Sequence, residues 1–62
     1  MKKYIIKYWE TEQDREQGNS ETYLILEDKF SALAHAEKLF YKNSFACVEV
    51  YTDNETCLTL EQ

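Results

Sequence analysis

The sequence lacks any long hydrophobic run, since no apolar stretch approaches the roughly 18 residues that a membrane-spanning helix needs. Its first residues also lack the basic, apolar and small-residue segments that a secretory signal carries in that order. There is no proline and only one glycine, Gly18, so the chain has no glycine-rich loop of the kind that cradles phosphates. These absences exclude a membrane-spanning helix and predict a cytoplasmic protein.

Positive charge is also scarce. Twelve acidic residues against seven basic ones leave a formal net charge of −5. Such a surface repels a phosphate backbone or an anionic membrane at long range. The only basic concentration, Lys2, Lys3 and Lys7, is short and interrupted by tyrosine. We therefore expect neither direct nucleic-acid binding nor membrane binding.

The two cysteines, Cys47 and Cys57, do not form the Cys-x-x-Cys pair that many zinc sites use. In the hairpin predicted below, they lie on the order of 13 Å apart at about 3.3 Å per residue. A disulfide needs Cα atoms within about 7 Å. The single histidine, His35, is expected on the far side of the core from both thiols. The sequence thus predicts free thiols, no metal site, no cofactor and no Cys-His catalytic pair.

Carboxylates are plentiful, but acid-base catalysis requires a sheltered cleft that shifts their pKa values. A chain of 62 residues with one main helix leaves little room for such a cleft. We therefore expect the protein not to be an enzyme and to have no small-molecule substrate.

The hydrophobic fraction of 44% predicts that residues 1–62 fold as a single domain. A domain of this size buries only about 60% of the surface that its unfolded chain exposes. Its stability is therefore marginal unless a disulfide, a metal or a partner contributes.

Two segments in the first half alternate as β-strands do, at residues 3–11 and 22–27. Pairing Ile6 with Leu26 and Tyr8 with Leu24 keeps their apolar side chains on one face. The polar stretch "ETEQDREQGNSE" between the strands is expected to be a loop. A tighter turn at "GN" is disfavoured, because its register mixes the two faces.

Residues 28–43, "DKFSALAHAEKLFYKN", predict a helix. Asp28 or Ser31 can cap its start, and Asn43 can adopt the left-handed conformation at its end. Spacing of about 100° per residue gathers the apolar side chains into one stripe. The stripe consists of Ala32, Leu33, Ala36, Leu39 and Phe40.

The last two strands are predicted at residues 45–52 and 56–61, joined by the three residues Asp53, Asn54 and Glu55. This connection pairs Val50 with Leu58 and Val48 with Leu60, and it places Asn54 or a neighbour in the left-handed region.

The sequence therefore predicts an α+β domain of the order ββαββ, with one four-stranded, mainly antiparallel sheet and a single helix packed on one face. This layout, with two hairpins around "FSALAHAEKLF", resembles that of many small bacterial and phage proteins in its hydrophobic pattern rather than in any motif.

The odd-numbered strand positions are too apolar for a bare solvent face, and no second helix is predicted to cover them. Aromatic residues are enriched where protein surfaces meet, because they bury a large area and keep a polar tip. We expect this face to form a homodimer or to bind another protein. The alternatives are a solvated sheet whose aromatic residues only reflect strand propensity, or a polar segment that folds back over Trp9. The candidate interface residues are Ile5, Trp9, Tyr23, Ile25, Phe45 and Tyr51.

A second hypothesis concerns the alternating acids at the end of the first strand. In an extended chain, Glu10, Glu12, Asp14 and Glu16 would line one edge with a spacing of about 6–7 Å. The protein would then be an acidic inhibitor or DNA mimic from a mobile element, occupying a nucleic-acid-binding surface. A solvated loop is the simpler interpretation.

Overall fold

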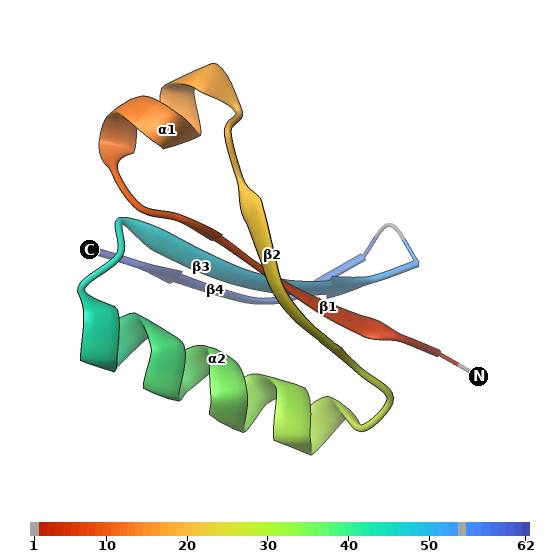
Figure 1. Ribbon diagram of the computed structural model, residues 1–62. Helices are drawn as coiled ribbons and strands as arrows, with labels where there is room; N and C mark the ends of the chain where they lie inside the picture. The colour runs from red at the N-terminus through yellow and green to blue at the C-terminus, as the bar shows by residue number, and fades with distance from the viewer. Residues whose placement is uncertain (1, 54) are drawn as a thin grey trace.

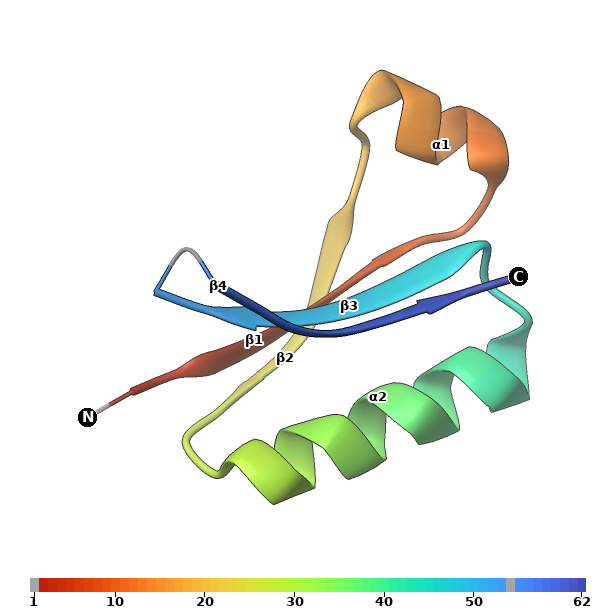
Figure 2. The ribbon, with the colours of Figure 1, turned by 180° about the vertical axis from the view of Figure 1, so that it is seen from behind.

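The computed structural model describes residues 2–53 and 55–62. Its four strands form one antiparallel sheet in the order β2-β1-β3-β4. Helix α2 lies along one face of the sheet, and the short helix α1 stands on the other side at one end (Figures 1 and 2). The predicted α+β fold and ββαββ order are confirmed. The elements are β1 (Tyr4–Trp9), α1 (Glu12–Gln17), β2 (Glu21–Leu26), α2 (Lys29–Asn43), β3 (Cys47–Thr52) and β4 (Glu55–Glu61).

Helix α2 packs on the sheet through the predicted stripe. Asp28 caps its start, because its carboxylate accepts a hydrogen bond of 2.8 Å from the backbone N–H of Ser31. Ala32 and Ala36 are fully buried and their small side chains bring the helix close to the sheet. The left-handed residue at the helix end is Ser44, with φ 55°, and not Asn43 as expected.

The core lies between α2 and the two central strands. Ile6 of β1 and Val48 and Val50 of β3 have no exposed surface, and they contact Leu39 and Phe40 of α2 in one cluster. The even-numbered positions therefore form the buried face, as the alternation predicts. Neither helix in the described part of the chain is long and apolar enough to cross a membrane.

The pairing of β1 with β2 differs from the expected register by two residues. Ile6 pairs with Leu24 and Tyr4 with Leu26, so the apolar residues still share a face. The ladder is interrupted after Leu24, where Lys7 pairs with Thr22 and leaves Tyr23 without a partner on β1. Tyr23 is the extra residue of a β-bulge, which turns its side chain.

The second hairpin confirms the pairs Val50 with Leu58 and Val48 with Leu60. The expected three-residue connection is wrong, since Thr52 already pairs with Glu55. A bulge at Cys57 absorbs the difference and restores the aliphatic register. Asp53 adopts the left-handed conformation with φ 44°, whereas the expectation for Asn54 lies outside the described residues.

The segment expected to be a loop contains α1. The hydroxyl of Thr11 caps the helix by accepting a hydrogen bond of 3.1 Å from the N–H of Asp14. Gly18 ends it in the left-handed region with φ 74°, which glycine adopts without strain. Arg15 binds the carboxylates of Glu12 and Glu61, each at 3.3 Å, and so ties α1 to the end of β4.

Candidate functional site

We define the outer face as the side of the sheet opposite α2. The strand pairing arranges its side chains in rows that cross the sheet. The Ile5 row, which consists of Ile25, Ile5, Tyr51 and Thr56, lies at the end away from α1. Ile25 is 51% exposed, and Ile5 and Tyr51 are half-buried. Three apolar side chains thus lie side by side, and no element among the described residues covers them.

The Lys7 row is the next one toward α1 and consists of Thr22, Lys7, Glu49 and Thr59. Lys7 and Glu49 are direct partners on the central strands, so charges of opposite sign are neighbours in the middle of the outer face. The ammonium of Lys7 lies 5.2 Å from the ring centroid of Tyr51, within cation–π range. The stem of Lys7 therefore leans toward the Ile5 row.

The Trp9 row lies at the α1 end and consists of Trp9, Cys47 and Glu61. Cys47 is only 1% exposed, and the Arg15–Glu61 ion pair links α1 to this row. Trp9 is half-buried. The polar segment thus folds back toward this end, which is one of the alternatives that the sequence left open, and the Ile5 row stays uncovered.

Two of the six candidate interface residues, Tyr23 and Phe45, lie on the α2 side rather than the outer face. The bulge turns Tyr23, whose ring centroid lies 6.5 Å from that of Tyr8. Phe45 precedes β3, so strand alternation does not govern it, and its ring stacks on Tyr8 at 4.5 Å. Their assignment to the outer face is wrong. The four that share that face are Ile5, Trp9, Ile25 and Tyr51.

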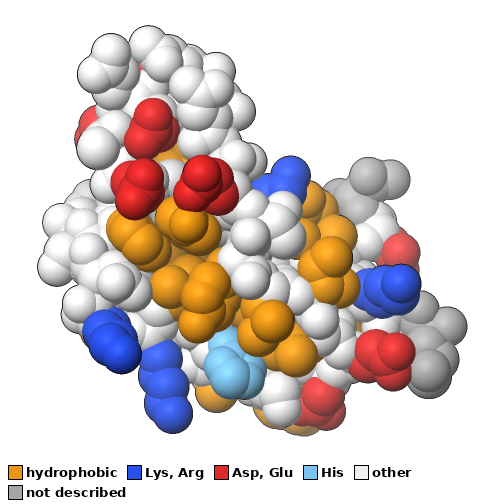
Figure 3. Space-filling view, viewed as in Figure 1, with side chains coloured by type: hydrophobic (Ala, Val, Ile, Leu, Met, Phe, Trp, Pro, Cys, Tyr) orange, Lys and Arg blue, Asp and Glu red, His pale blue; other side chains and the backbone are white. Residues whose placement is uncertain are grey.

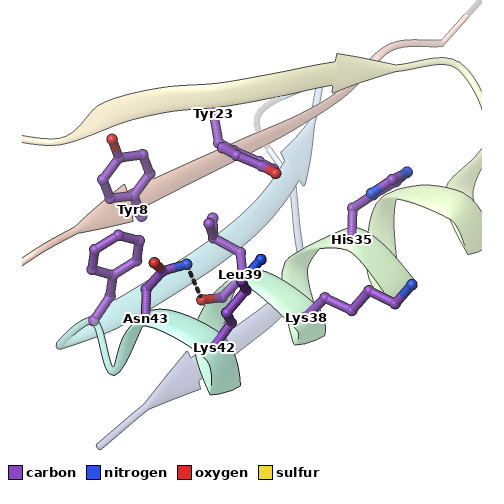
Figure 4. Close-up of a pocket in the computed structure, with 8 residues that line it drawn as sticks. Tyr8, Tyr23, His35, Lys38, Leu39, Lys42 and Asn43 are labelled. Carbon is purple, nitrogen blue, oxygen red and sulfur yellow. Dashed lines mark hydrogen bonds between the residues drawn. The ribbon is translucent and has the colours of Figure 1, made fainter.

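Tyr23 and Phe45 instead help to line a groove between β2 and α2, which we call the aromatic groove. Its volume is about 390 Å³. Figure 4 shows the lining residues, from the strands above and from α2 below, and Figure 3 shows the apolar patch at the surface. His35 of α2 is exposed and lies on its wall. The lining residues are Tyr8, Tyr23, His35, Lys38, Leu39, Lys42, Asn43 and Phe45.

The four acids of the proposed nucleic-acid mimic do not lie along an extended edge. Glu12, Asp14 and Glu16 belong to α1, where the rise is about 1.5 Å per residue and successive side chains point in different directions. Glu12 is also engaged by Arg15. The regular spacing on which the mimic hypothesis depends is therefore absent. Asp14 and Glu10 instead border a polar hollow of about 310 Å³, together with Tyr8 and Glu21.

Both cysteines are free and they face opposite sides of the sheet. Cys47 lies on the outer face, whereas Cys57 packs against the core on the α2 side because of its bulge. Burial raises the pKa of the Cys47 thiol, although the nearby Arg15 guanidinium opposes this shift.

On the α2 side, the hydroxyl of Tyr8 donates a 2.7 Å hydrogen bond to Oε2 of Glu21, and this bond raises the pKa of Tyr8.

These shifts predict that alkali destabilises the fold. The folded state holds the Cys47 proton more tightly than the unfolded chain, whose thiol has a pKa of about 8.5. The stability from this group is complete below that pH and is lost as the pH rises toward the higher folded-state pKa. Tyr8 adds a similar loss above about pH 10. Urea unfolding at a series of pH values from neutral to about pH 11 measures both losses.

The matched variants are Cys47→Ala and Cys57→Ala. We expect Cys47→Ala to remove the part of the decline that begins near the unfolded thiol pKa of about 8.5, and Cys57→Ala to retain it. An unfolding free energy that rises with pH in this range would contradict the assignment.

Within residues 2–53 and 55–62, no group of three or more His, Cys, Asp and Glu side chains is placed to hold a metal ion. The structure instead provides an uncovered apolar row and an aromatic groove on opposite sides of one sheet.

Comparisons with known proteins give no relative from which a function could be transferred. No protein-family model matches the chain, and neither the curated proteins nor the solved structures contain a match.

Proposed function

We propose that the protein is a non-catalytic protein-binding module that forms a homodimer through the outer face. The supporting observation is the Ile5 row, in which Ile25, Ile5 and Tyr51 lie in register across three strands without a covering helix. Uncovered apolar and aromatic side chains of this kind are typical of association surfaces.

The charges beside the row favour a second copy as the partner. Lys7 and Glu49 are neighbours of opposite sign at the middle of the face. A two-fold interface brings the same patch of both subunits together, so it must complement itself. A patch with one cation beside one anion meets this condition, because a second copy offers each charge its opposite. A face with a single sign of charge would repel its copy.

The size of the protein suggests that α1 joins the interface. A stable interface buries about 800 Å² on each partner. That is about a fifth of the 4313 Å² that this chain exposes, more than the Ile5 row alone can offer. The exposed side of α1 adjoins the same face, so we expect the second copy to contact both.

Ile25→Glu tests the homodimer. Ile25 is 51% exposed in the single chain, so a carboxylate there does not disturb the core, but it would be buried in the dimer. We expect wild type to sediment as a dimer and Ile25→Glu to weaken association by at least about 30-fold, from a loss of about 2 kcal/mol or more. Sedimentation equilibrium over a concentration series measures the dissociation constant.

The matched control is Tyr41→Glu, since Tyr41 is 73% exposed on the solvent side of α2. It should sediment as wild type does. A wild type that is monomeric at every concentration would refute the homodimer, and so would an Ile25→Glu variant that remains as dimeric as wild type.

A further inference from the structure

The aromatic groove has a basic wall, although the chain as a whole is acidic. One wall carries three basic side chains of α2, His35, Lys38 and Lys42, and none of the eight lining residues is acidic. The chain as a whole has a net charge of −5. The ion pairs found among the described residues all involve Arg15, so Lys38 and Lys42 are not neutralised there. The groove therefore complements an anionic group.

The floor of the groove complements an apolar group. The rings of Tyr8 and Phe45 are stacked at 4.5 Å with an interplanar angle of 12°, and Tyr23 meets Tyr8 edge to face at 6.5 Å. Tyr23 remains 48% exposed. The side chain of Asn43 is oriented by a 3.1 Å hydrogen bond from its Nδ2 to the carbonyl of Leu39 (Figure 4). Such a floor is formed before any ligand arrives, which lowers the entropy cost of binding.

The surroundings favour a peptide over a small anion. β2 is an edge strand, so its outer backbone groups have no neighbour in the sheet. Beyond Tyr8, the surface becomes acidic at Glu10, Asp14 and Glu21. In Figure 3 acidic side chains lie on the α1 side of the apolar patch, and the histidine lies on its α2 side. An extended chain can cover the aromatic floor and reach the basic wall at the same time, whereas a small anion contacts the basic wall alone.

We propose that the aromatic groove binds a short extended segment of another protein that carries an acidic side chain next to an apolar one. The carboxylate lies between Lys38, Lys42 and His35, and the apolar side chain rests on Tyr23 and Phe45. The segment runs along β2, but the bulge at Tyr23 interrupts regular backbone pairing, so side-chain contacts dominate. This site lies on the opposite side of the sheet from the outer face and does not depend on the proposed homodimer.

A selection from a random dodecapeptide display library tests the proposal. The two baits are wild type and the double variant Lys38→Glu, Lys42→Glu. Wild type should enrich peptides with an acidic residue adjacent to a large apolar one. The enriched peptide should bind the double variant about 10- to 100-fold more weakly, because charge-assisted contacts are lost. Fluorescence anisotropy of the labelled peptide measures the affinity.

The control is Lys2→Glu, Lys29→Glu, which changes the net charge equally at two exposed lysines that do not line the groove. It should bind the peptide about as wild type does. Backbone amide shifts should concentrate on β2 and on α2 around His35. The proposal is overturned if wild type enriches no peptide, if lysine-rich peptides are enriched instead, or if the shifts lie on the outer face.

The proposed homodimer and the proposed peptide site can be tested independently. Substitutions at Lys38 and Lys42 should leave the sedimentation behaviour of the protein unchanged, since neither residue lies on the sheet. Ile25→Glu should leave the affinity for the selected peptide unchanged if the groove acts independently, because Ile25 points to the outer face. An Ile25→Glu protein that no longer binds the peptide would refute that independence.

Discussion

Phe40→Ala is expected to lower the free energy of unfolding by about 3–5 kcal/mol, because it removes a buried aromatic ring and leaves a cavity. Phe40 is 9% exposed and belongs to the cluster formed by α2 and the central strands. A domain of 62 residues has a total stability of only about 3–9 kcal/mol. The variant should therefore lose a large part of its stability, which circular dichroism during a urea titration would detect as a lower unfolding midpoint.

Phe30→Ala is the matched control, since it makes the same change in the same helix. Phe30 is 78% exposed, so its truncation should change the stability by no more than about 0.5 kcal/mol. Comparable losses for the two variants would mean that α2 presents a different face to the sheet from the one described.

Ala36→Leu is expected to lower the free energy of unfolding by about 1–3 kcal/mol, because the larger side chain overpacks the core. Ala36 is fully buried where α2 meets the sheet, beside the side chains of β1 and β3. Three additional carbons can be accommodated only if the helix moves away from the strands. Thermal unfolding should show a lower midpoint for this variant than for wild type.

Ala34→Leu provides the comparison two residues away. Ala34 is exposed on α2, and leucine and alanine have similar helix propensities, so the stability should stay within about 0.5 kcal/mol of wild type. If Ala36→Leu were as stable as wild type while Ala34→Leu lost stability, the close helix–sheet contact would be refuted.

The parts of the fold that follow regular periods could be predicted from the sequence. The stripe from Ala32 to Phe40 repeats as a helix does, and the even positions of the strands alternate as a half-buried sheet does. The pairing of Val50 with Leu58 could also be predicted, because this register keeps the aliphatic side chains of the two strands on one face. In each case one simple rule covers many residues.

The two bulges could not be predicted in this way. A bulge inserts one residue into a strand, and the alternation on either side looks the same with or without it. Its position depends on how the two strands and the turn fit together in space. As a result, Tyr23 and Cys57 were assigned to the outer face but lie on the α2 side, and the aromatic groove was missed. The stacking of Phe45 on Tyr8 was missed for a similar reason, since residue 45 lies before β3.

Helix α1 is an intermediate case. Thr11 and Gly18 are recognisable start and stop signals, and they could have indicated a helix between them. A helix of six residues is nevertheless too short to be stable by itself in water. The Arg15–Glu61 contact joins residues 46 positions apart, so local sequence does not reveal it. The position of α1 against the end of β4 could therefore not be predicted from the local sequence.

The bulge at Cys57 gives the protein a pair of intrinsic chemical reporters. One thiol is covered at the α1 end of the sheet, and the other is half-buried against the α2 core. Alkylation of the wild-type protein, followed by mass spectrometry, would therefore give two rates. The rate at Cys47 reports detachment of α1, and the rate at Cys57 reports loosening of α2. The order in which the two adducts form would show which helix leaves the sheet first.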